Sequence, residues 1–301
     1  MQRITVNEKI KYLVPDSMKN FSACAGIIVK GRKKILIDTN MGPSETAALF
    51  SAEQPDIAIS SHYHLDHSAW CWTALSECDA VLYIPEIEAE YYRDFNHFIK
   101  MTCGPYGLGK EWREFAYNVT GFREVSKFET YTPDVEFDVG GSIIKCLPSP
   151  GHSPGHTSFY LPDEKILFTG DMGIDRFGPW YGWFDCDLFS FIDSILRLKS
   201  METEILITSH GGILKENIGS AWDKCLAFFI ENERSVASLL EKGTSSEEIV
   251  SEGLFYKGKE KVGEPMRSFL YMWDDMILKN HEKCLKNGSL ESYINKHNSF
   301  S

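Results

Sequence analysis

Six consecutive residues of this sequence combine three imidazoles with one carboxylate. The run is His62-Tyr63-His64-Leu65-Asp66-His67, and it follows the short apolar segment Ile57-Ala58-Ile59. Imidazole nitrogens and carboxylate oxygens are good ligands for divalent metal ions. If these side chains were only polar loop residues, their hydrogen bonds would have to be satisfied by other groups or by water. The pattern therefore favours a metal site.

Three further candidate ligands follow apolar segments later in the chain. His152 lies within Pro148-Ser149-Pro150-Gly151-His152-Ser153-Pro154-Gly155, where prolines fix φ and glycines permit a tight turn. Asp171 follows Ile166-Leu167-Phe168, and His210 follows Ile205-Leu206-Ile207. We therefore expect the ends of four strands to converge on one site.

The candidate ligands need strands to position them, and the apolar pattern predicts those strands. We expect strands at 26–29, 35–37, 56–60, 81–84, 135–139, 142–147, 157–161, 165–168 and 205–208. Helices are expected at 44–52, 86–98, 110–117, 188–199, 227–240 and 269–278. The order of strands and helices in the first half is repeated in the second. This repetition predicts an α+β fold in which two sheets pack together with helices outside.

The helical segments suggest how the chain is divided. We expect a catalytic domain at 1–214, with a helical insert at about 85–129, and a C-terminal helical region at 215–301. Either Thr244 or Ser245 could cap a helix in that last region. The aromatic insert could act as a lid or only pad the sandwich. The aromatics of Arg176–Phe184 could line a substrate pocket or pack in the core.

Composition restricts the partners and the location. The formal net charge of the 301 residues is -12, which disfavours general binding to nucleic acid. The eight cysteines form no C-x-x-C pair, and we expect free thiols. The first residues contain no apolar signal segment, and no apolar run approaches the length of a membrane helix. We therefore expect a cytoplasmic protein without a membrane partner.

Taken in order, these motifs resemble those of the metallo-β-lactamase superfamily. The resemblance rests on the H-x-H-x-D-H run at 62–67, on Gly151-His152, on Gly170-Asp171 and on His210. It covers about residues 20–215 and implies a four-layer αβ/βα sandwich with the metals at one edge. The C-terminal part resembles the helical tail of the glyoxalase-II-like and RNA-cleaving branches, so a C-terminal helical appendage is expected. Such a region could also form a homodimer.

The resemblance also implies a role for each candidate ligand. It assigns one metal ion to His62, His64 and His152, a second to Asp66, His67 and His210, and a bridging position to Asp171. Asp66 is also the candidate catalytic residue, because it would orient the water and accept a proton. Zinc is our first expectation for the two divalent ions, and iron or manganese would fit the same ligands. We expect Asp38 to fix the loop backbone without binding metal, and His156 to lie either behind the ligands or at the surface.

The resemblance implies a metal-dependent hydrolase that acts on a small molecule. Two ions can hold a bound hydroxide that attacks a small ester, thioester or lactone. A phosphodiesterase or ribonuclease of the same superfamily is the alternative enzyme, and a non-catalytic metal-binding sensor is the alternative outside catalysis. Asp171 stands where class B β-lactamases commonly have Cys, so a β-lactam substrate is disfavoured. Ser68-Ala69-Trp70 also lacks the glycine that usually follows the first motif.

Overall fold

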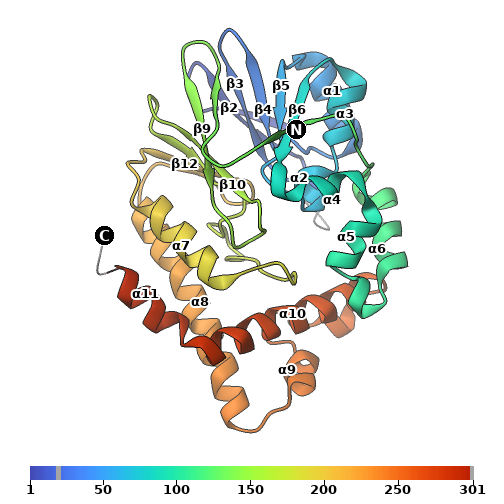
Figure 1. Cartoon of the computed structure of the whole chain (residues 1–301), viewed down its shortest axis with the longest axis vertical. Helices are drawn as coiled ribbons and strands as arrows, with labels where there is room; N and C mark the ends of the chain where they lie inside the picture. Colours follow the sequence, from blue (N-terminus) through green and yellow to red (C-terminus); the bar gives the residue numbers. More distant parts are fainter. Residues whose placement is uncertain (18–21, 299–301) are drawn as a thin grey trace.

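Two mixed β-sheets form the centre of the computed structural model, which describes residues 1–17 and 22–298 (Figure 1). The first sheet has the order β1-β2-β3-β4-β5-β6-β7, formed by Gln2–Thr5, Ile10–Val14, Gly26–Lys30, Lys34–Ile37, Ile57–Ile59, Val81–Pro85 and Glu129–Tyr131. The second has the order β13-β12-β11-β10-β9-β8, formed by Gly212–Leu214, Ile205–Thr208, Ile166–Phe168, Thr157–Leu161, Ile143–Pro148 and Glu136–Asp138. The expected two-sheet arrangement is confirmed.

Each sheet contains a parallel pair of strands joined by a helix. In the first sheet β4 and β5 are parallel, and α1 (Pro43–Glu53) connects them. In the second sheet β11 and β12 are parallel, and α7 (Leu188–Lys199) lies between them in the chain. Parallel neighbours place their carboxyl ends at the same edge of a sheet. The residues that follow these four strands therefore lie at one edge.

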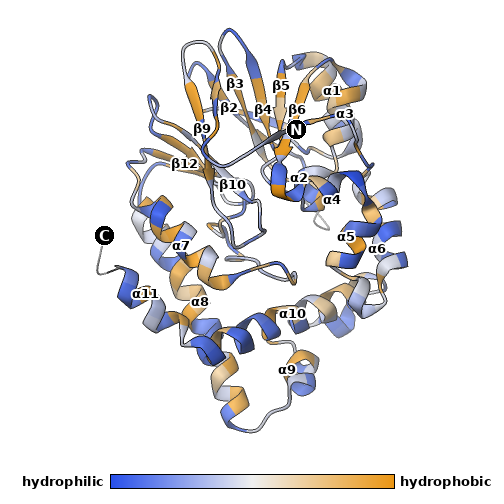
Figure 2. Cartoon of the chain, viewed as in Figure 1, coloured by the Kyte–Doolittle hydropathy of each residue, from blue (hydrophilic) through white to orange (hydrophobic). Residues whose placement is uncertain are grey.

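Alternation along the strands explains why the sheets pack face to face. In β3, Ile27 and Val29 belong to a fully buried cluster between the sheets, whereas Ile28 belongs to the cluster on the helical side. Successive side chains of a strand point to opposite faces, so both faces of this strand are apolar. Phe159 and Phe168 enter the inter-sheet cluster from the second sheet. Figure 2 shows the resulting hydrophobic strands.

Helices cover the outer faces of both sheets and complete the four layers. On the first sheet, α1 packs with α3 (Cys71–Glu77), while α7 packs beside the second sheet (Figure 1). A short helix, α2 (Leu65–Ser68), carries part of the first motif. Helical segments between β6 and β7 are η2 (Glu86–Glu88), α4 (Ala89–Arg93), α5 (Phe95–Met101), η3 (Gly104–Tyr106), α6 (Gly109–Phe115) and η4 (Ala116–Thr120).

The C-terminal helices pack against α7, which lies on the second sheet, and against the segment between β6 and β7. They are α8 (Ile218–Glu241), α9 (Ser246–Glu252), η5 (Lys259–Lys261), α10 (Met266–Asn287) and α11 (Leu290–Asn298). The ring centroids of Trp112 and Phe269 lie 5.0 Å apart, which joins α6 to α10. Ser245 caps α9 in a capping box with Glu248, as its sequence suggested. Among the described residues, no helix has the length and hydrophobicity needed to cross a membrane.

Replacing Phe159 by Ala should destabilise the protein strongly. Phe159 is fully buried between the sheets, and removal of such a ring typically costs about 3–5 kcal/mol. Phe177→Ala is the matched control, because Phe177 is 69% exposed and should change the free energy of unfolding by less than about 0.5 kcal/mol. Urea denaturation measures both values. Equal effects of the two substitutions would contradict the proposed inter-sheet core.

Candidate metal centre

The seven candidate ligands lie together at the edge of the sandwich where the parallel strands end. His62 follows β5, Asp171 follows β11 and His210 follows β12, while His152 lies in the loop after β9. The remaining three ligands lie in and just before α2, where His64 is the N-cap and Asp66 and His67 follow. The strand ends therefore converge as the sequence suggested.

The ligand atoms form two adjacent clusters. The first contains His62, His64 and His152, and the second contains Asp66, His67, Asp171 and His210; within each cluster the atoms lie within 4.8 Å of one another. Asp171 faces both clusters. Its Oδ2 lies 3.3 Å from His210 Nε2 and 3.7 Å from His152 Nε2. This central position agrees with the bridging role that the resemblance implied.

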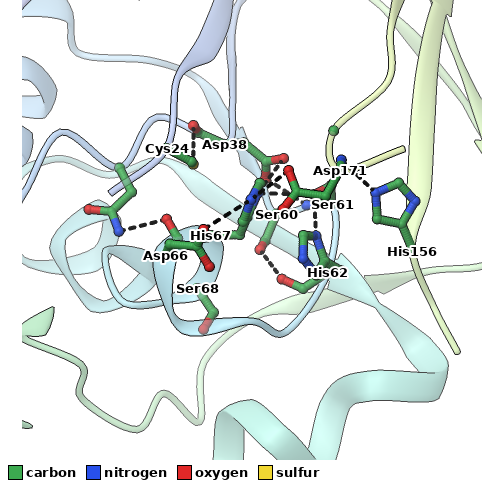
Figure 3. Close-up of polar contacts among 12 residues, drawn as sticks. Cys24, Asp38, Ser60, Ser61, His62, Asp66, His67, Ser68, His156 and Asp171 are labelled. Atoms are coloured by element: carbon green, nitrogen blue, oxygen red, sulfur yellow. Dashed lines mark hydrogen bonds and ion pairs between the residues drawn. The ribbon is translucent and has the colours of Figure 1, made fainter. Parts of the chain in front are cut away.

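Polar partners on Nδ1 fix the direction of three of the imidazoles, and Figure 3 shows those of His62 and His67. His67 Nδ1 lies 3.0 Å from Asp38 Oδ2, and His62 Nδ1 lies 2.9 Å from Ser61 Oγ. His152 Nδ1 donates to the carbonyl oxygen of Trp180 at 2.8 Å. A partner on Nδ1 sets the ring orientation and leaves Nε2 for a metal ion. These contacts direct the Nε2 atoms toward the interior of the site.

Asp38 holds both a ligand and the loop that carries it. Asp38 Oδ1 accepts the backbone N–H of Ser61 at 2.8 Å, and Asp38 Oδ2 is the partner of His67 Nδ1. Asp38 is fully buried and adopts a φ of 50°, a left-handed conformation that Asp tolerates better than most residues. The expectation that Asp38 supports the loop backbone is confirmed.

Burial and neighbouring charges give the two clusters different protonation preferences. Burial lowers the pKa of His62, His64 and His152, so these imidazoles stay neutral with a free lone pair. Burial opposes ionisation of Asp171. The imidazoles of His210 and His67 outweigh that effect and hold the pKa of the Asp171 carboxyl well below its usual range. Burial opposes protonation of His67 and His210, but the Asp171 carboxylate outweighs it and raises the pKa of both imidazoles well above their usual range. The second cluster therefore pairs an ionised carboxylate with imidazoles that favour a positive charge, whereas the first cluster is neutral.

Unpaired polar atoms test whether these residues suit a metal ion. Within the described ranges, His64 Nε2, His67 Nε2 and Asp171 Oδ1 are buried and make no hydrogen bond, although His67 Nε2 and Asp171 Oδ1 lie 3.2 Å from each other as an ion pair. His152 Nε2 also lies only 3.2 Å from His62 Nε2. Because His152 Nδ1 donates to Trp180, the Nε2 atom of His152 carries a lone pair that faces His62. Buried polar groups without partners are rare in folded proteins. Divalent ions would satisfy all of these atoms, so the residues fit two metals.

The second cluster lies nearer to solvent than the first. The side chain of His210 is 23% exposed, and those of Asp171 and Asp66 are 13% and 12% exposed. In the first cluster the side chain of His152 is only 2% exposed, and within the second cluster His67 alone is fully buried, at 0%. A substrate would therefore approach from the side of His210, Asp66 and Asp171.

His156 supports the site without entering either cluster. Its Nε2 accepts the backbone N–H of Asp171 at 3.1 Å, and its Nδ1 lies 2.8 Å from Ser149 Oγ (Figure 3). Burial lowers the pKa of His156 to about 3, which keeps the accepting nitrogen unprotonated. His156 therefore fixes the backbone at Asp171.

Glu88 is a supporting residue that the sequence did not indicate. It lies in η2, is fully buried, and accepts hydrogen bonds from Ser153 Oγ at 2.6 Å and from the backbone N–H of Gly155 at 2.7 Å. Burial raises the pKa of the Glu88 carboxyl to about 8, although these two donors oppose the shift. Glu88 therefore attaches the segment between β6 and β7 to the loop that carries His152.

The aromatic segment after Asp171 contributes to the site and to the core. The ring of Trp180 meets the imidazole of His64 at a centroid distance of 5.4 Å and that of His152 at 5.8 Å. Tyr181 and Trp183 are buried in the hydrophobic core. Of the two interpretations of Arg176–Phe184, core packing therefore holds for Tyr181 and Trp183, while Trp180 borders the metal ligands.

Comparison with known proteins agrees with the fold and the motif order. The family model described as the metallo-beta-lactamase superfamily matches residues 21–210. The chain belongs to the metallo-β-lactamase superfamily. The matched range includes all seven candidate ligands and the strands from β3 to β12, and it supports a hydrolase as the general class of enzyme.

Relatives of this superfamily member include hydrolases with different names. An atrochrysone carboxyl ACP thioesterase from Passalora fulva is 25% identical over 198 residues, which are 63% of this chain and 48% of the thioesterase. A probable metallo-hydrolase from Bacillus subtilis, YflN, is 26% identical over 214 residues, covering 59% of this chain and 75% of that protein. The matched region thus spans less than half of the thioesterase's length.

Solved structures match nearly the whole chain. A metallo-beta-lactamase family protein from Thermus thermophilus has a TM-score of 0.70 at 18% identity and covers 94% of this chain and 95% of its own. A beta-lactamase domain protein from Burkholderia ambifaria has a TM-score of 0.72 at 14% identity, with coverages of 95% and 90%. At these identities the similarity concerns the fold, and it extends to the C-terminal helices.

Replacing Asp38 by Ala should weaken metal binding, because His67 and the N–H of Ser61 would lose their acceptor. Removing such a partner typically lowers metal affinity about 10–100-fold. Asp56→Ala is the matched control, since Asp56 accepts from the backbone of Lys34 at the opposite end of β5. Competition between the folded protein and a chelator for Zn²⁺ measures both affinities. Unchanged affinity in Asp38→Ala would show that Asp38 does not orient a ligand.

Proposed function

We propose that this chain is a metal-dependent hydrolase of a small ester, thioester or lactone, with two divalent ions at the seven ligands. Zinc is the metal that we expect first, with iron or manganese as alternatives. The observation that carries the proposal is the pair of adjacent ligand clusters with Asp171 between them. When bound, paired ions would lower the pKa of a water molecule and polarise the carbonyl oxygen of the substrate.

The protein's own residues support attack at the open side of the site. Asp66 Oδ2 lies 3.2 Å from His210 Nε2. Its main-chain carbonyl accepts a hydrogen bond from Asn40 Nδ2 at 2.7 Å, which fixes this part of α2. A carboxylate held at the opening can orient a water molecule and accept its proton. We therefore assign the catalytic proton acceptor to Asp66.

Charge favours an acyl substrate over a phosphodiester. The hydrogen bonds and ion pairs of the seven ligands within the described ranges involve no Lys or Arg. Phosphoryl groups are usually held by such cations, and the chain has a formal net charge of -12. The name of the thioesterase relative supports the same preference for acyl transfer to water.

Turnover of a substrate panel tests this function. We expect hydrolysis of p-nitrophenyl acetate, of a short acyl thioester or of a lactone, and little hydrolysis of bis(p-nitrophenyl) phosphate. Turnover of the phosphodiester alone would favour a phosphodiesterase or ribonuclease. Stoichiometric metal without turnover of any of these compounds would favour a metal-binding sensor.

Replacing Asp171 or His62 by Ala should remove metal and activity together. A metal centre contributes several kcal/mol to the reaction, so the activity should fall at least about 100-fold. Asp163→Ala is the control for the carboxylate substitution, because Asp163 lies exposed in the turn between β10 and β11. Elemental analysis and turnover are measured on the same samples. An Asp171→Ala protein with two metals and full turnover would contradict the site assignment.

A further inference from the structure

The segment at 180–187 has neither helix nor strand, so side-chain contacts must fix its position. Three residues of the C-terminal helices bind it at Tyr181. Asn232 of α8 donates to the Tyr181 hydroxyl at 2.9 Å, and His281 Nε2 of α10 lies 2.9 Å from the same oxygen. Asn280 donates to the Tyr181 carbonyl at 3.0 Å. The segment is therefore attached to α8 and α10.

The same segment also fixes the loop that presents His152. The carbonyl of Trp180 accepts from His152 Nδ1 at 2.8 Å, and the Cys186 thiol donates to the His152 carbonyl at 3.1 Å. The backbone N–H of Asp187 donates to the Gly151 carbonyl at 2.9 Å. The position of the His152 ring thus depends on the position of residues 180–187.

Tyr256 links Trp180 to the C-terminal helices at the point nearest to the ligand. Its hydroxyl accepts from Trp180 Nε1 at 2.6 Å, and its backbone N–H donates to Asp274 Oδ1 at 3.1 Å. The other oxygen of Asp274 pairs with Lys259, and both of these side chains are only 1% exposed. The backbone of Tyr256 is therefore bound to α10, and its hydroxyl binds the indole of Trp180.

We infer that Tyr256 is a positioning residue for the metal ligand His152, acting through Trp180. The hydroxyl of Tyr256 fixes the indole of Trp180, and the backbone carbonyl of Trp180 fixes His152 Nδ1. The C-terminal helical region is then a structural part of the metal centre. This inference rests on the proposed metal site, and it adds a requirement for residues outside the matched range 21–210.

Tyr256→Phe tests the inference, because it removes one hydroxyl and keeps the ring. We expect one of the two Zn²⁺ sites to bind about tenfold more weakly in competition with a chelator, with the other site unchanged. The visible spectrum of the Co²⁺-substituted protein should also change, since it reports the geometry of the ligands. Tyr293→Phe is the matched control, because the Tyr293 hydroxyl on α11 donates to Asp193 on α7 at 2.9 Å. This substitution should leave the Zn²⁺ affinities and the Co²⁺ spectrum unchanged.

Trp180→Phe is the second variant, and it keeps the carbonyl while it removes the indole donor. It should lose at least as much affinity as Tyr256→Phe, because it also changes the ring beside His64 and His152. Adding Tyr256→Phe to Trp180→Phe should cause no further loss, because the hydrogen bond between the two side chains is already broken. If Tyr256→Phe does not fold, unchanged metal affinity in Trp180→Phe is the result that overturns the inference. Wild-type affinity and an unchanged Co²⁺ spectrum in a folded variant would overturn the inference. Failure of the wild type to bind metal would instead overturn the proposed function on which it rests.

Discussion

Three buried ligand atoms without hydrogen bonds define the constraint on which this structure depends. His64 Nε2, His67 Nε2 and Asp171 Oδ1 are removed from water and make no hydrogen bond to another described residue; the last two face each other at 3.2 Å as an ion pair. An unsatisfied buried polar atom costs roughly 1–3 kcal/mol, so a site that contains several of them favours a bound cation. The fold must hold these atoms together against the cost of burying them. The two parallel strand pairs, β4 with β5 and β11 with β12, do so by ending at one edge.

The support for the ligands comes from several layers of the fold. Asp38 at the end of β4 orients His67, and His156 binds the backbone at Asp171. Glu88 holds the loop after His152 from the segment between β6 and β7, and Trp180 holds His152 itself. A metal centre assembled this way needs the inter-sheet core, the segment at 86–120 and the C-terminal helices at once. This dependence gives a physical reason why helices far from the ligands in sequence belong to the same structure.

The sequence allowed the ligands and most strands to be predicted, because both leave local patterns. The H-x-H-x-D-H run indicated four candidate ligands that the structure brings together, and apolar alternation located strands such as β3 and β4. The strand β1 was missed because all four of its residues are exposed and lack that alternation. Helix α10 is longer than the predicted 269–278, since the buried polar residues Asn280 and His281 interrupt its apolar pattern. The role of Trp180 left no signal, because every residue offers the carbonyl that binds His152.

Metal content is the most direct test of the central claim that these seven side chains bind two ions. The protein should be purified without a histidine tag or added metal and analysed by plasma mass spectrometry, before and after reconstitution with Zn²⁺. We predict about two equivalents of divalent metal per chain. A folded protein that binds no metal even after reconstitution would contradict the account, because the unpaired ligand atoms would then need another explanation.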